Sequence, residues 1–140
     1  MKLALGTAFL AASALFSLFT SWSSVSQPSI FGHRLGLSIE FPDGFNEIRA
    51  QYGGFFLALA VVDALALTGI VRRDTSFVTN AAVSGGLIVG RLTSLFMGEA
   101  FGAYGNVIVA LFFIDGVGFA LSTICLLWER RGFQVVRNGS

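Results

Sequence analysis

The sequence predicts an all-α membrane protein, a bundle of four transmembrane helices that forms a single membrane domain over residues 1–140. Hydrophobic residues make up 54% of the chain and charged residues only 12%, whereas ordinary soluble domains carry about 25% charged residues. Apolar stretches long enough to cross a hydrocarbon core of about 30 Å, which takes about 20 helical residues, recur along the chain. Basic residues gather on one side of these stretches, as they do in membrane proteins.

The composition excludes several classes of function. The net charge is only +1, and no basic run or basic helix face could follow nucleic-acid phosphates, so we expect no nucleic acid as a partner. Cys125 is the only cysteine and His33 the only histidine, which excludes an intrachain disulfide and a multi-thiolate metal site. We expect no metal and no cofactor, and we expect the lipid bilayer as a partner.

The first helix is predicted at residues 3–25, which carry no charge and follow Lys2. A secretion signal cut after Ser26 would show the same features, but its apolar core usually has only about 7 to 15 residues. We therefore expect a retained helix, with the signal peptide as the alternative. Residues 26–45, which hold both prolines, are expected to form an outer loop with a short strand or an interfacial segment.

The second helix is predicted at residues 46–71, where Asp63 is the one charge inside the apolar part. Alternating steps of three and four place its polar and small residues on one face, together with Phe56: Asn46, Arg49, Gly53, Phe56, Ala60 and Asp63. The bulky Phe55, Leu59 and Leu65 fall largely elsewhere. We expect the polar face to look inward, onto other helices.

The third helix is predicted at residues 77–97, after a very short turn that makes it an antiparallel neighbour of the second. Small residues repeat in it at four-residue spacing, at Ala82, Gly86 and Gly90. This pattern lets membrane helices approach closely. The fourth helix is predicted at residues 103–128 and carries Asp115 near its middle.

The orientation follows from the basic residues. With four spans, one face of the membrane holds most of them: Lys2, Arg72, Arg73, Arg130, Arg131 and Arg137. The loops of the other face hold Arg34 alone. Because basic loops stay in the cytoplasm, we expect both termini there and a multi-pass protein of the bacterial inner (cytoplasmic) membrane.

Charged residues inside the spans need polar partners, because each costs about 2.5 to 3.5 kcal/mol at the centre of a span on insertion scales. Counting about 1.5 Å per residue from the cytoplasmic ends puts Arg91 and Asp115 at equal depth. They lie on consecutive antiparallel helices, so we expect an ion pair between them.

The same count places Arg49 and Glu99 together at the outer boundary, with Asn46 and Glu47 close by. Asp63 has no basic residue at its depth. The hydroxyls and glycines available to it are Ser13, Ser84, Gly85 and Ser122. We expect a protonated or hydrogen-bonded carboxyl, which serves either as a packing contact or as a proton-relay or solute site.

Three stretches resemble a family of small bacterial four-helix membrane proteins that is catalogued as a domain of unknown function: NEIRAQYGGFFLALA, GRLTSLFMGEAFG and FFIDGVGFALS. The resemblance covers roughly residues 45–128. It implies a four-helix bundle whose shared polar centre comprises Asn46, Glu47, Arg49, Tyr52, Gly53, Gly90, Arg91 and Ser94. It implies no activity.

The features favour a non-enzymatic interaction partner or accessory subunit of a membrane complex, since the predicted loops are short and the helices carry small-residue faces. The alternative is a transporter or channel-like protein for a small solute or protons, working as an oligomer, with Asp63, Arg91 and Asp115 along the path. An enzyme is not expected, because the sequence offers no nucleophile–base pair, metal constellation or phosphate loop.

Overall fold

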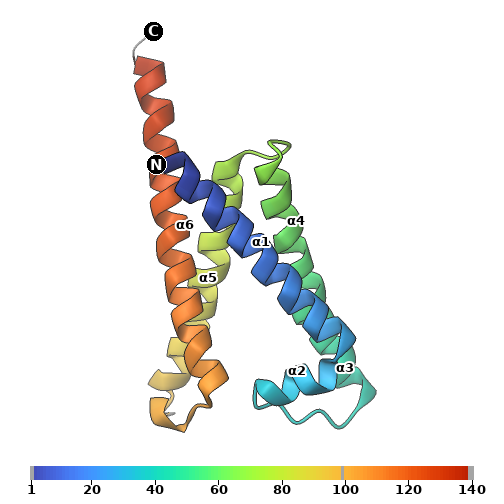
Figure 1. Ribbon diagram of the computed structural model, residues 1–140. Helices are drawn as coiled ribbons and strands as arrows, with labels where there is room; N and C mark the ends of the chain where they lie inside the picture. The colour runs from blue at the N-terminus through green and yellow to red at the C-terminus, as the bar shows by residue number, and fades with distance from the viewer. Residues whose placement is uncertain (1, 99, 139–140) are drawn as a thin grey trace.

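The computed structural model describes residues 2–98 and 100–138, and every regular element within them is helical (Figure 1). In chain order the elements are α1 (Lys2–Ser26), α2 (Pro28–Arg34), α3 (Pro42–Ile48), the π-helix η1 (Arg49–Gly54), α4 (Phe55–Leu67), α5 (Arg73–Phe96), the 3-10 helix η2 (Phe101–Ala103) and α6 (Asn106–Asn138). The predicted all-α class is confirmed.

Three helical segments of the described chain are long and apolar enough to cross a membrane: Leu3–Ser26, Pro42–Leu67 and Asn106–Arg130. The second of them joins α3, η1 and α4 into one continuous helical column. With 24 residues α5 is also long enough, but its charged and amide side chains make it less apolar than the other three. These segments indicate a multi-pass membrane protein.

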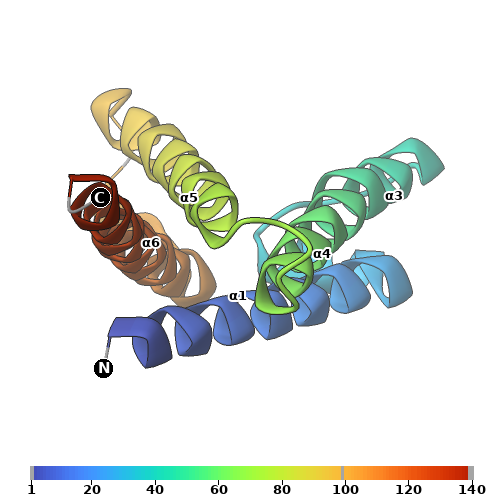
Figure 2. The ribbon, with the colours of Figure 1, turned by 90° about the horizontal axis from the view of Figure 1, so that it is seen from above.

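The long helices are arranged as two pairs (Figures 1 and 2). α1 packs along the η1–α4 column, and α5 packs along α6. The pairs meet where α4 turns into α5 and spread apart toward the opposite end, where α2, α3 and η2 lie (Figure 1). The η1–α4 column and α5 are thus consecutive and antiparallel, as expected, although each packs mainly against another helix. The start of α1 and the C-terminal part of α6 lie at the end where the pairs meet.

The buried core lies at this meeting point. Leu10 of α1, Ala66 of α4, Phe77 of α5 and Cys125 of α6 form it, and none of them is more than 3% exposed. Each of the four long segments supplies one residue. The core therefore holds the two pairs together at one end, while the other end stays open.

Several predicted boundaries are wrong. The outer loop predicted at residues 26–45 includes α2 and the start of α3, and the described part of this segment contains no strand. Pro28 and Pro42 do not break these helices, because each lies in the first helical turn, where the missing N–H would be unsatisfied anyway. The second long segment therefore begins at Pro42. It ends at Leu67, before Gly69, whose φ of 79° stops a helix.

The third and fourth helices also begin elsewhere than predicted. α5 starts at Arg73, before residue 77, and ends at Phe96, where Gly98 with a φ of 100° follows. α6 starts at Asn106 because the 3-10 turn η2 precedes it, and it continues past residue 128 to Asn138.

The π-helical turn η1 divides the polar face that was predicted for the second segment. A π-turn takes one extra residue, so the residues before it are rotated by about 100° from their place in a regular α-helix. Gly53 and Asp63 are buried, as expected, whereas Asn46 and Arg49 are exposed. The prediction of one continuous inward face is therefore wrong.

Candidate functional site

The buried carboxyl group of Asp63 joins the two helix pairs. It is fully buried on α4, and its Oδ1 accepts hydrogen bonds from the hydroxyl of Ser76 and, at 2.7 Å, from Nδ2 of Asn80. The hydroxyl of Ser13 on α1 donates to Oδ1 of Asn80 at 2.7 Å, so the network reaches a third helix. Among the described residues, Oδ2 of Asp63 has no hydrogen-bond partner.

The hydrogen-bonded state expected for Asp63 is confirmed, but with other partners. Of the predicted neighbours only Ser13 takes part, and it acts through Asn80. Ser122 instead donates to backbone carbonyls of its own helix. The direct partner Ser76 belongs to the first turn of α5, which the predicted start at residue 77 left outside the helix.

Arg91 and Asp115 form the ion pair that depth counting predicts. Nε of Arg91 lies 2.7 Å from Oδ2 of Asp115 and links α5 to α6. The two side chains are largely buried, with exposed fractions of 19% and 9%. Cζ of Arg91 also lies 5.7 Å from the ring centroid of Phe112, within reach of a cation–π attraction. The sequence prediction of this pair is confirmed.

A cleft of about 380 Å³ lies between the two helix pairs, next to the Asp63 network. Its walls come from α1, α4, α5 and α6 and are mainly apolar, with Phe9, Phe16, Phe56, Leu59, Leu87 and Phe113 among them. Asn80 and Asp115 also line it, so both polar networks reach its wall. Leu59, which was expected away from the inward face, is buried, because α4 faces this cleft as well as α1.

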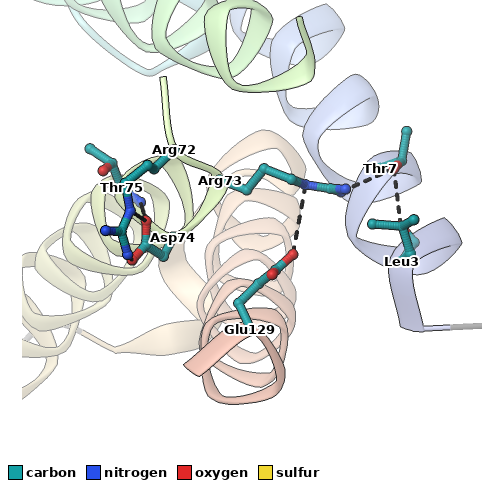
Figure 3. A network of polar contacts seen from close by, with 7 residues as sticks. All are labelled: Leu3, Thr7, Arg72, Arg73, Asp74, Thr75 and Glu129. Carbon is teal, nitrogen blue, oxygen red and sulfur yellow. Dashed lines mark hydrogen bonds and ion pairs between the residues drawn. The ribbon is translucent and has the colours of Figure 1, made fainter. Parts of the chain in front are cut away.

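A second polar cluster lies where the pairs meet (Figure 3). Arg73, at the start of α5, donates from Nη2 to Oγ1 of Thr7 at 3.0 Å, and its Nε lies 3.8 Å from Oε1 of Glu129. One side chain thus connects α5 to α1 and α6. Sequence spacing alone could not predict this cluster, because Thr7, Arg73 and Glu129 are far apart in the chain and share no motif.

Arg72 and Asp74 form a separate ion pair in the same turn (Figure 3). Nη2 of Arg72 lies 2.6 Å from Oδ2 of Asp74, and Nε lies 3.0 Å from Oδ1. The hydrogen bond from Arg72 holds the pKa of Asp74 below its usual range. The side chain of Arg72 is 70% exposed, so water screens the pair and it contributes little to stability.

The predicted outer residues of the second segment hold the end of α1. Nε of Arg49 donates to the carbonyl of Val25 at 3.3 Å, a position where a cation also favours a helix C-terminus. A Cβ at Gly53 would lie 2.5 Å from Cγ2 of Val25, so only glycine permits this approach without a shift of Val25. Asn46 and Glu47 are exposed beside these contacts.

The shared polar centre implied by the resemblance is not assembled as one site. Tyr52 of η1 packs its ring against Phe31 of α2, with ring centroids 5.1 Å apart. Arg91 and the half-buried Ser94 lie on α5, and the pairs diverge at this end (Figures 1 and 2). Glu99, the predicted partner of Arg49, lies outside the described residues, so that ion pair stays a prediction.

The site offers hydrogen bonds and buried charge. In residues 2–98 and 100–138, no group of three or more His, Cys, Asp or Glu side chains could hold a metal ion. Asp63 and Asp115 carry carboxyl groups that could exchange protons, and Arg91 supplies donors beside an apolar cleft.

A family model described as a domain of unknown function, DUF4345, matches residues 5–114, which is more than half of the chain. The match begins inside α1 and ends inside α6. It therefore includes most of the first helix and residues 26–44, which lie outside the region of the resemblance found in the sequence. No curated protein and no solved structure gave a significant match.

Proposed function

The chain belongs to the DUF4345 family, a domain of unknown function, and on that premise we propose a non-enzymatic interaction or accessory subunit of a membrane complex. In this proposal the protein lies in the bacterial inner membrane, and α5 crosses it in addition to the three more apolar segments. The observation that carries it is a face of α5 that the chain itself leaves uncovered.

This face of α5 is formed by Ala82, Gly86 and Gly90, which are all exposed. A Cβ added at Gly86 or Gly90 would meet no atom within 4 Å. The contact with α6 uses a different glycine: a Cβ at Gly85 would lie 3.2 Å from the ring of Phe119. Small residues at four-residue spacing favour close packing of membrane helices, and this supports a partner helix on the uncovered face.

We expect that purification from native membranes in mild detergent yields a stoichiometric partner protein, and that the double variant Gly86→Leu, Gly90→Leu loses it. Leucine at these positions should not disturb the fold, because both point into open space. The matched control is Ala110→Leu, Ala120→Leu on exposed positions of α6, which should retain the partner. A chain that purifies alone, or a partner that both variants retain, would contradict the proposal.

A specific observation supports the second candidate, a proton-coupled or small-solute transporter. Asp63 is fully buried with Oδ2 unbonded among the described residues, and its hydrogen-bond partner Asn80 lines the cleft. Ionisable groups inside membrane spans often mark ion and proton paths. A self-oligomer without a foreign partner, obtained in the same purification, would favour this candidate.

We also propose that both termini are cytoplasmic and that the first helix is retained. The start of α1 and the C-terminal part of α6 lie at the same end of the molecule, which supports an even number of spans with α5 as one of them. A reporter fused after Ser140 should show a cytoplasmic C-terminus. Mass measurement of the mature chain should show residues 1–26 present, because α1 supplies core residue Leu10. A periplasmic reporter or a shortened chain would contradict the respective part.

A further inference from the structure

We propose that the cleft between the two helix pairs binds one acyl chain of a membrane phospholipid, with the ester carbonyl of that chain at Arg91. The cleft volume of about 380 Å³ falls in the range of roughly 300 to 1,000 Å³ found for small-molecule sites. This inference is independent of the proposed interaction function, which concerns another face of α5.

The shape of the cleft suits a chain that enters from the open end. On α5 its wall runs from Asn80 to Leu87, about 10 Å along the helix axis. Arg91 lies one turn beyond Leu87, on the same face and toward the end where the pairs diverge. Phe16, Phe56 and Phe113 supply apolar wall on the other helices. An empty apolar cleft would forfeit dispersion contacts on its lining, which an acyl chain restores.

The chemistry beside the cleft suits an uncharged acceptor, because Arg91 is bonded to Asp115 of the cleft wall. Arg91 uses Nε for Asp115 and lies over the ring of Phe112. Its Nη1 and Nη2 have no hydrogen-bond partner within the described chain. Asp115 already balances the charge, so a neutral carbonyl fits better than an anion, which would bring a second negative charge into the same site.

The depth of Arg91 agrees with this assignment. It lies five residues before Phe96, the end of α5, which is about 8 Å along the helix. The polar end of a phospholipid lies at the boundary of the hydrocarbon core, and the guanidinium of Arg91 is held beside Asp115, a residue of the cleft wall. The ester group and the guanidinium can therefore meet while the chain extends toward Asn80.

Native mass spectrometry of the detergent-purified protein, titrated with dioleoyl phosphatidylcholine, tests the proposal. We expect one retained lipid per chain. The ether-linked analogue, which has the same headgroup and chains but no ester carbonyl, should bind about tenfold more weakly, the loss expected for one hydrogen bond to a charged group. Equal retention of the two lipids, or no retained lipid, would overturn the assignment.

Substitutions in the cleft wall and at the ion pair locate the site. Ala12 lies exposed in the wall of the cleft, so Ala12→Phe fills the cleft without crowding the core and should lower lipid retention several-fold. Ala12→Leu is the milder version, and Ala58→Phe, at an exposed position of α4 outside the cleft, is the matched control. Arg91→Met with Asp115→Leu should abolish the preference for the ester over the ether. If Ala12→Phe instead dissociates a dimer of this protein and leaves lipid retention unchanged, a second copy occupies the cleft and the proposal fails.

Discussion

Arg91→Met is expected to lower the free energy of unfolding by about 3 to 5 kcal/mol, because Asp115 then stays buried without its counter-charge. Asp115→Leu should have a similar effect, since it leaves the guanidinium of Arg91 buried without a counter-charge. The double variant should recover most of the loss, because apolar residues of similar volume need no partner in this position. The expected rescue is the signature of a pair that acts as one unit.

Thermal unfolding in detergent, monitored by circular dichroism, measures these changes in stability. Arg34→Met removes an arginine from an exposed position and is the matched control. It should change stability by no more than about 0.5 kcal/mol, as surface substitutions usually do. If either single variant of the buried pair behaves like this control, Arg91 and Asp115 do not pair in a dry interior.

Asp63→Leu is expected to lower the free energy of unfolding by about 2 to 6 kcal/mol, because the buried donors on Ser76 and Asn80 each lose an acceptor at about 1 to 3 kcal/mol. Asp63→Asn keeps an oxygen in the same place and should cost much less. Asp43→Leu, at an exposed position of α3, is the control and should be close to neutral.

The two Asp63 variants also separate the candidate functions. An asparagine cannot exchange a proton near neutral pH, so Asp63→Asn should keep fold and function in an interaction subunit but keep only the fold in a proton-coupled transporter. The protonated carboxyl of Asp63 stays a prediction. Infrared difference spectra of wild type against Asp63→Asn test it. An unfolded Asp63→Asn variant would contradict the structural role assigned to Oδ1.

Two parts of the site could be predicted from the sequence to different extents. Arg91 and Asp115 lie on consecutive helices joined by a short connection, so the rise per residue fixes their relative depth and a charge needs a counter-charge. The partners of Asp63 could not be predicted this way, because many hydroxyl and amide residues lie at a similar depth. Their choice depends on where α5 begins and how it is rotated, as the position of Ser76 in its first turn shows.

By itself the sequence determined that this is a helical membrane protein with an ion pair between Arg91 and Asp115, since composition, apolar length and rise per residue are local properties of the chain. Only the tertiary structure decided that the helices form two diverging pairs, that Arg73 joins three helices, and that the small-residue face of α5 stays uncovered. The π-turn at Arg49–Gly54 is the clearest case. Such turns are rare inside helices, and here the turn contains Gly53, whose close approach to Val25 at the end of α1 no local pattern encodes.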